Sequence, residues 1–207
     1  MNLELAKLSA KDRYKLLIGA IVPRPIAWVS TLSATETVNL APFSAFSYMG
    51  NDPAIIAFSP GASKDTFLNI QREREFVVNL VPVALMNAMN LTATDFPPEV
   101  SELEQAGLTS ASSVQIRTPR IAQSPVNLEC RVHSILEIGA NRVVIGEVVE
   151  FHIKDELIDA EKLYVDSAKL DLLARMGGAA AYATTRDALE LPRISYRAWL
   201  ERDESKS

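Results

Sequence analysis

Residues 126–153 read VNLECRVHSILEIGANRVVIGEVVEFHI, and this stretch decides the fold class. Two long runs, 126–138 and 143–153, are rich in β-branched residues and favour strands. The four residues between them, Gly139-Ala140-Asn141-Arg142, are typical of a hairpin turn. In the second run Phe151 and Ile153 share one face while Glu150 and His152 share the other. The stretch therefore predicts a pair of long antiparallel strands.

The rest of the chain adds shorter strands and a few helices. We expect strands at 26–32, 38–49, 54–58 and 76–80, with a polar turn at 33–37 that makes the first two a hairpin. Helical spacing occurs at 65–75, 83–93 and 167–175, and 4–17 fits a short helix or an extended arm. The segment 95–125 is a long surface excursion with a short helical piece at 100–106. Since strands outnumber helices, the pattern favours an antiparallel barrel decorated with short helices over a parallel α/β sheet.

Composition narrows the class of protein. The 207 residues are 48% hydrophobic, enough for one domain over 1–207 with a sizeable core. A net charge of −5 without a long basic block argues against nucleic acid or an anionic membrane as partner. No segment reaches the roughly 20 apolar residues of a membrane span, and the N-terminus has no apolar signal-peptide core. We expect a cytoplasmic protein whose charged tail, 201–207, is frayed.

The numbers of cysteine and histidine residues exclude an internal disulfide and a thiolate-rich zinc site. One cysteine, Cys130, cannot form an internal disulfide, and one cysteine with two histidines cannot build a thiolate-rich zinc site, so no metal is expected. Cys130 is interpreted as a small buried hydrophobe.

Ser63-Lys64-Asp65-Thr66 opens the predicted helix after a strand and a loop of small residues. Free backbone N–H groups at a helix start, two hydroxyls and one ammonium suit a phosphate group. Ser, Asp and Thr at this position are also ordinary helix caps, with Asp65 a candidate cap here. The chain contains no GxxxxGK[ST] loop and no GxGxxG fingerprint, so neither of these nucleotide sites is expected.

Three segments read with this cluster carry a family resemblance. They are PRPIAWVST at 23–31, NLAPFS at 39–44 and the loop at 59–66. Four further motifs follow in order along the chain: PRI at 119–121, SPVNLEC at 124–130, IGEV at 145–148, and RMGG at 175–178 followed by Tyr182. Together they resemble the flavin reductase-like family of FMN-binding split barrels, which includes flavoredoxins and flavin reductase components. The resemblance covers about 12–197.

That resemblance implies a homodimer that binds FMN in a groove near the subunit interface. By matching positions, the isoalloxazine ring would lie on Ser30, Thr31, Asn39 and the Ala41 backbone. The phosphate would be held by Ser59, Ser63, Lys64 and Thr66, with Arg24 as a further contributor. NADH or NADPH would donate hydride to the flavin, and no catalytic residue is assigned because the flavin itself performs the redox step.

Three functions remain open on the sequence. The leading hypothesis is an NAD(P)H-dependent flavin reductase, free-standing or serving a flavin-using monooxygenase. A flavoredoxin-like electron carrier with bound FMN and a non-catalytic FMN-binding module are the alternatives.

Five further side chains have two interpretations each. His133 and His152 are either ordinary strand residues or proton carriers, with His152 the stronger candidate for a role near the nicotinamide or the interface. Trp28 belongs to the barrel core or to a wall near the flavin. Arg175 and Tyr182 either reach the cofactor or the partner subunit, or are a helix-end charge and a packed aromatic.

Overall fold

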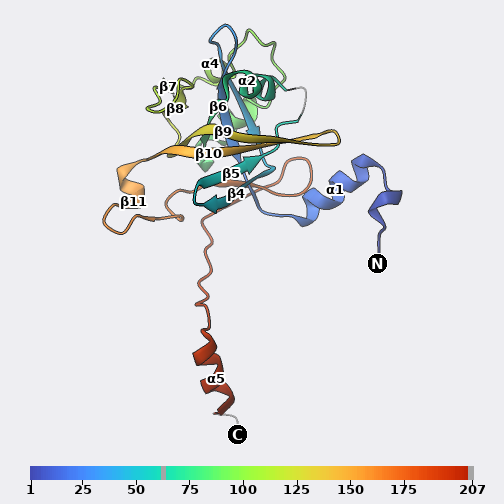
Figure 1. Ribbon diagram of the computed structural model, residues 1–207, viewed down its shortest axis with the longest axis vertical. Coiled ribbons are helices and arrows are strands. Elements are labelled where there is room, and N and C mark those ends of the chain that lie inside the picture. The colour runs from blue at the N-terminus through green and yellow to red at the C-terminus, as the bar shows by residue number, and fades with distance from the viewer. Residues whose placement is uncertain (62–63, 205–207) are drawn as a thin grey trace.

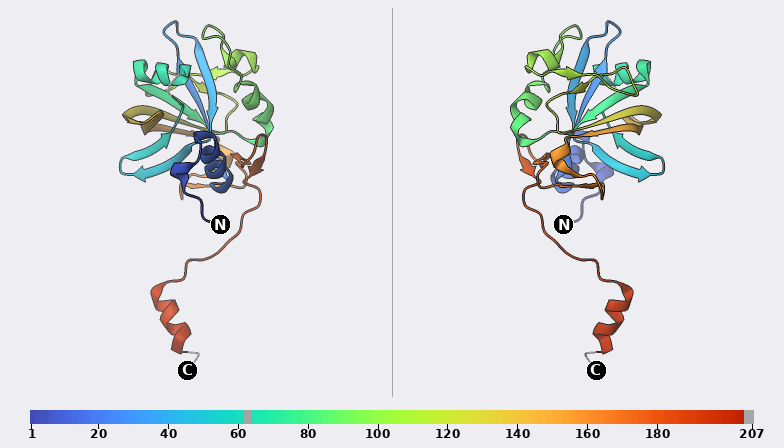
Figure 2. Two further views of the ribbon diagram at one scale, coloured as in Figure 1. Left: turned by 90° about the vertical axis from the view of Figure 1, so that its right-hand side faces the viewer. Right: turned by 90° about the vertical axis from the view of Figure 1, so that its left-hand side faces the viewer.

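One seven-stranded antiparallel sheet forms the body of the protein (Figures 1 and 2). The computed structural model describes residues 1–61 and 64–204, with the backbone alone from 201 onward. In sheet order the strands are β3 (Val38–Phe43), β2 (Ala27–Leu32), β6 (Glu75–Asn79), β9 (Val126–Ile138), β10 (Asn141–Ile153), β5 (Ala54–Phe58) and β4 (Phe46–Asn51). Neighbouring strands are antiparallel throughout.

The two edges of this sheet, β3 and β4, come together where the chain passes from one to the other. Only Ser44 and Ala45 separate the two strands in sequence. The Ser59 N–H donates to the Ala45 carbonyl over 2.9 Å, and the Phe43 and Phe58 rings lie 5.5 Å apart. The sheet therefore rolls into an incompletely closed barrel, which confirms the predicted fold class.

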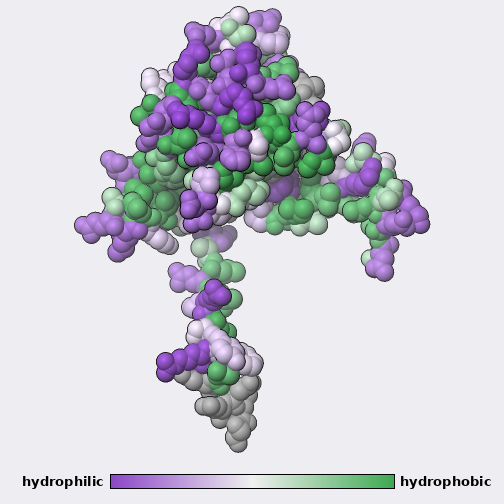
Figure 3. All heavy atoms as spheres, viewed as in Figure 1, coloured by the Kyte–Doolittle hydropathy of each residue, from purple (hydrophilic) through white to green (hydrophobic). Residues whose placement is uncertain are grey.

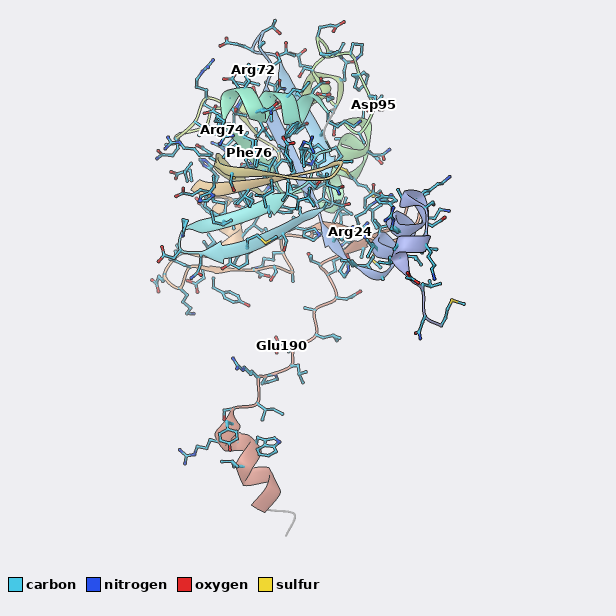
Figure 4. All side chains as sticks on the ribbon, turned by 45° about the vertical axis from the view of Figure 1, so that its right-hand side comes forward. Arg24, Arg72, Arg74, Phe76, Asp95 and Glu190 are labelled. Carbon is cyan, nitrogen blue, oxygen red and sulfur yellow. The ribbon has the colours of Figure 1, made fainter. Side chains whose placement is uncertain are left out.

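Apolar side chains cover both faces of the rolled sheet. Phe76 lies inside the barrel, with its ring 5.3 Å from that of Phe58 (Figure 4). On the outer face a second cluster surrounds Trp28, which is fully buried and donates from Nε1 to Thr92 Oγ1 at 2.8 Å. These contacts place Trp28 in the core, and they seal the outer face of β2 beneath the excursion and its helices.

The helices are short and flank the barrel. They are η1 (Leu5–Lys7), α1 (Ala10–Ala20), α2 (Asp65–Glu73), η2 (Val83–Leu85), α3 (Met86–Leu91), α4 (Glu102–Gln105), η3 (Asp155–Leu157) and α5 (Tyr196–Glu204). The small strands are β1 (Arg24–Pro25), β7 (Ser110–Ala111), β8 (Arg120–Ile121), β11 (Ile158–Asp159), β12 (Tyr164–Val165), β13 (Leu173–Arg175) and β14 (Tyr182–Thr184). No helix in the described part of the chain is both long and apolar enough to span a membrane.

Three local predictions were wrong. The expected strand at 38–49 is two strands, because the chain turns at Ser44 and Ala45 and β4 pairs with β5 instead of β2. The expected helix at 167–175 does not form; Asp171 has a φ of 46°, and the residues after it form β13 between β1 and β14. The long hairpin turns on two residues, Gly139 and Ala140, since β10 already begins at Asn141.

Beyond residue 185 the chain leaves the body as an extended arm that ends in α5 (Figure 1). Helix α5 extends through Glu204 of the tail that we expected to be frayed, and 205–207 lie outside the described residues. Figure 3 shows apolar residues in green along this arm. Leu189 and Leu191 are almost fully exposed, and Ile194 and Tyr196 are more than half exposed. The arm therefore presents apolar surface that its own chain leaves uncovered.

Cys130 is buried in the barrel core, as expected from the sequence. Burial raises the pKa of its thiol far above the usual value, and the nearby Glu129 charge adds to the increase. The thiol is therefore protonated and chemically inert at neutral pH.

The close contact between Gly146 and Phe76 provides a test of barrel packing. A Cβ at Gly146 would lie 2.5 Å from Phe76 Cζ and 3.4 Å from Cys130 Cβ, so any side chain must displace the core. We expect Gly146→Ala to lower the free energy of unfolding by about 1–3 kcal/mol, as overpacking does in other cores. Urea denaturation measures this.

The matched control is Gly19→Ala in α1, where no atom lies within 4 Å of the new Cβ. It is expected to leave stability unchanged or to increase it by up to about 1 kcal/mol through helix propensity. Equal effects of the two variants would contradict the described packing of β10 against Phe76.

Candidate functional site

The start of α2 carries the predicted phosphate-binding residues. Lys64 is the N-cap residue and Thr66 lies in the first turn, where backbone N–H groups have no partner within the helix. The Lys64 ammonium pairs with the Asp95 carboxylate, and both side chains are largely exposed. This pairing lowers the pKa of Asp95 through its hydrogen bond and charge. Exposed pairs of this kind contribute little to stability, so Lys64 can exchange Asp95 for another anion at small cost.

Ser59 and Ser63 were predicted to hold the phosphate together with Lys64 and Thr66. The Ser59 hydroxyl donates to the Arg142 carbonyl at 2.7 Å, so it ties the end of β5 to β10. Ser63 lies outside the described residues. A contact of either with phosphate stays a prediction.

A buried polar network fixes the start of α2 against the β2–β3 hairpin. Asn39 Oδ1 accepts from the hydroxyls of Thr31 (3.2 Å) and Thr66 (2.9 Å). Asn69 donates to Thr31 Oγ1 at 3.1 Å. On the other side Asn39 Nδ2 donates to Glu102 Oε1 at 2.9 Å, and the second Glu102 oxygen accepts from the Leu40 N–H. The network thus brings two residues predicted for the ring, Thr31 and Asn39, into contact with Thr66, predicted for the phosphate, and flavin contacts by Asn39 and Thr66 stay predictions.

Ser30 belongs to a second buried network. Its hydroxyl donates to the Pro119 carbonyl at 2.7 Å and accepts from Asn79 Nδ2 at 3.2 Å. Ser30 and Thr31 are both fully buried, and their hydroxyls hold the excursion and α2 against the sheet. Ala41 is half-buried in β3 opposite Val29. Flavin contacts by these three residues stay predictions.

A groove of about 240 Å³ opens beside the end of β3. It is lined by Ile26, Pro42, Phe43, Ser44, Met89, Asn90, Ala93, Arg175, Ala179 and Tyr182. The chain that leaves this groove at Ala93 reaches Asp95, the partner of Lys64, two residues later. Apolar walls with a few polar groups suit a flat aromatic ligand. The groove and the start of α2 therefore make one candidate site.

Arg175 and Tyr182 line this groove as a stacked pair. The Arg175 guanidinium lies 4.7 Å from the centre of the Tyr182 ring and donates to the carbonyls of Gly178, Ala179 and Ala181. The interpretation of Arg175 as a helix-end charge is wrong, because the residue ends strand β13. Both side chains are within reach of a ligand in the groove.

Arg24 serves a structural role in the described contacts. Its Nη1 donates to the carbonyls of Ile18 (2.6 Å) and Ile21 (2.7 Å), and its Nη2 donates to Met176 (3.2 Å). These bonds hold the end of α1 against β13 (Figure 4). A phosphate contact by Arg24 would require these bonds to break, and it stays a prediction.

Sequence reasoning singled out His152 but missed Glu129, the buried acid that it contacts. Glu129 in β9 is fully buried, and its carboxylate accepts from the N–H groups of Val114 (2.8 Å) and Gln115 (2.7 Å). His152 Nε2 on β10 lies 2.6 Å from Glu129 Oε1. Burial opposes ionisation of Glu129, but the hydrogen bonds from Gln115, His152 and Val114 outweigh it and lower its pKa. His133, by contrast, lies exposed in the middle of β9.

No metal site is evident: among the described residues, no three His, Cys, Asp or Glu side chains are grouped so that they could hold an ion.

Comparison with known proteins agrees with this architecture. The model of the flavin reductase like domain matches residues 19–172. An uncharacterized protein of Deinococcus radiodurans is 44% identical over 210 residues, which cover 97% of this chain and 92% of the relative.

Two solved structures are also similar over nearly their whole length. One is Pseudomonas fluorescens 2-nitrobenzoate 2-nitroreductase NbaA, with 34% identity, a TM-score of 0.88 and coverage of 95% of this chain and 98% of that one. The other is nitrilotriacetate monooxygenase component B from Bacillus cereus, with 32% identity, a TM-score of 0.87 and coverage of 92% and 98%. The family match spans most of the chain, the rolled antiparallel sheet is the fold expected for it, and the chain therefore belongs to the flavin reductase-like family.

Proposed function

We propose that this protein binds FMN and transfers hydride from NADH or NADPH to the flavin. The observation that carries the proposal is the start of α2, where Lys64 caps the helix and pairs with Asp95, which lies two residues beyond Ala93 in the wall of the apolar groove. Family membership and the likeness to a nitroreductase and to a monooxygenase component support a redox role. A cytoplasmic location remains a prediction.

The residues of this site fit FMN in two respects. A phosphate group needs donors and positive charge, which the first turn of α2 and Lys64 supply. The ring needs apolar surface with polar groups at its edge, which Pro42, Phe43 and the backbone of β3 supply. Thr66 and Asn39 hold these two parts at a fixed separation through their 2.9 Å hydrogen bond.

The redox chemistry in this proposal belongs to the bound flavin. The protein binds the phosphate at α2, orients the ring against β3 and excludes water with the side chains of the groove. Backbone N–H groups and hydroxyls at the ring edge would stabilise negative charge there. Arg175, held over Tyr182, adds a fixed positive charge at the groove wall. No side chain is assigned as an acid, base or nucleophile.

The recipient of the electrons distinguishes two candidate functions. Likeness to monooxygenase component B favours reduction of free flavin for a partner oxygenase. Likeness to NbaA favours direct reduction of a nitroaromatic compound at the same site. The first is our leading proposal, because it needs no second substrate site beside the flavin.

We propose that the protein is a homodimer. The apolar side chains of the arm at 186–200 and a helix α1 that buries none of its own residues support this proposal, since a second copy would cover both. Light scattering at micromolar concentration tests it, and a monomer would count heavily against a groove shared between subunits.

Replacement of Lys64 tests the phosphate site. We expect Lys64→Ala to weaken FMN binding by about 1–3 kcal/mol, the contribution of a charge-assisted contact, and to leave riboflavin binding unchanged. Fluorescence titration with each flavin measures both affinities. Lys162→Ala is the control, because Lys162 is an exposed lysine paired with Asp159 at the surface. Unchanged FMN affinity in Lys64→Ala would remove Lys64 from the site.

An absorbance spectrum of the purified protein, recorded without oxygen before and after addition of NADH or NADPH, tests the function itself. We expect a flavin spectrum that bleaches with one nucleotide, which identifies the donor. Steady nucleotide consumption with free flavin supports the reductase, and consumption only with a nitroaromatic compound supports the second candidate. Bleaching by a protein donor alone indicates a flavoredoxin-like carrier, and bound flavin without turnover indicates a binding module. No flavin signal even after incubation with FMN would overturn the site.

A further inference from the structure

A second pocket lies at the end of the long hairpin, where β10 runs into η3. Its volume is about 380 Å³, and its polar lining residues are Arg120, Ser124, Asn127, His152 and Lys154. Two permanent cations and one histidine therefore border it, and no acidic side chain is among its lining residues. The pocket stands apart from the groove beside β3, since the two share no lining residue.

The histidine of this pocket is held by a buried charge. Glu129 is 0% exposed, and its hydrogen bonds keep it ionised against the cost of burial. An ionised carboxylate only accepts hydrogen bonds, so the proton between the two side chains lies on Nε2 of His152. The other ring nitrogen, Nδ1, is then available to a ligand. Glu129 fixes the ring from behind, as an outer carboxylate does for histidines at many functional sites.

The two cations are placed differently around the pocket. Arg120 is partly buried and is held from the excursion side, with Nε donating to the Ser112 carbonyl at 3.1 Å and Nη1 lying 3.5 Å from Asn127 Oδ1. A guanidinium has five N–H donors, and these described contacts use two of them. Lys154 is exposed at the rim. A planar fork, an ammonium and a ring nitrogen suit the oxygen atoms of a phosphate or a carboxylate.

The two other polar side chains of the pocket, Ser124 and Asn127, already form hydrogen bonds within the protein. The Ser124 hydroxyl contacts the carbonyls of Leu80 and Val126, and Asn127 Nδ2 donates to Asn79 Oδ1 at 2.8 Å. These bonds make the floor rigid and leave recognition to Arg120, His152 and Lys154.

We propose that this pocket binds an anionic group, a phosphate or a carboxylate, through Arg120, His152 and Lys154, and that Glu129 is a positioning residue for the His152 ring. Binding at this pocket is independent of FMN binding at α2, so each proposal can fail without the other.

The chain contains only two histidines, and this makes the test direct. Side-chain ¹⁵N–¹H spectra of the full-length protein are recorded during titration with pyrophosphate and, separately, with benzoate. We expect saturable shifts of the His152 ring while His133, exposed on the hairpin, stays constant. Response to pyrophosphate alone indicates a phosphate-bearing ligand such as a nucleotide, and response to benzoate alone indicates an organic acid.

Charge-removing variants complete the test. Arg120→Gln should weaken the fitted affinity by at least about tenfold, as expected for the loss of one charge-assisted contact. Lys162→Gln removes an equal charge at a surface pair away from the pocket and should leave the affinity unchanged. An absent or non-saturable response at His152, equal shifts at both histidines, or equal affinities of Arg120→Gln and wild type would overturn the proposal.

The role of Glu129 is tested in the wild-type protein, so it does not depend on whether a Glu129 variant folds. The ¹⁵N shifts of the unliganded His152 ring should show the proton on Nε2. A ring protonated on Nδ1 and free on Nε2 would show that Glu129 does not position it.

Discussion

The half-buried amide of Asn39 makes the contacts on which the candidate flavin site depends. Its oxygen accepts from Thr31 in β2 and from Thr66 at the start of α2, while its nitrogen donates to Glu102 in α4. One side chain therefore joins the edge of the sheet, the first turn of a helix and the excursion. A buried carboxylate and two buried hydroxyls would each lose a partner without it, and unpaired buried polar groups cost about 1–3 kcal/mol each. This cost fixes the helix start relative to the groove, as a preorganised site requires.

A second set of polar side chains, on the outer face of the sheet, holds the excursion in place. Asn79 lies at the end of β6, and its Oδ1 accepts hydrogen bonds from Asn127 Nδ2 and the Ile121 N–H. Its Nδ2 donates to Ser30 Oγ. The excursion at 95–125 is thus bound to the sheet by hydrogen bonds as well as by the cluster around Trp28. The same excursion contributes Arg120 to the second pocket, at the end of the long hairpin. It also supplies the backbone N–H groups of Val114 and Gln115, which keep Glu129 charged. A segment without long elements is thereby held rigid enough to form one wall of a site.

The sequence predicted the barrel because its strands are long, β-branched and separated by clear turns, and residues 126–153 form the expected hairpin. It predicted that Lys64 and Thr66 lie at a helix start, because a helix start after a loop of small residues is a local pattern. Local pattern could not show that β4 crosses to the far edge of the sheet, since the strand periodicity of 38–49 is the same for either partner. The pairing of Asp95 with Lys64 was not predicted, because the two residues are 31 positions apart in the sequence. The Glu129–His152 pair depends on a β-bulge between Val148 and Glu150, which sets the register and has no reliable signature in sequence.

Hydrogen exchange of the full-length protein with and without FMN tests most directly the claim that the flavin lies between β3 and the start of α2. The account predicts that FMN slows exchange of backbone amides at 39–44 and 64–67 and leaves those at 120–127 and 150–154 unchanged, because bound ligand protects the amides that it contacts or rigidifies. Protection confined to 120–127 and 150–154, or no protection at 64–67 when FMN is saturating, would contradict it.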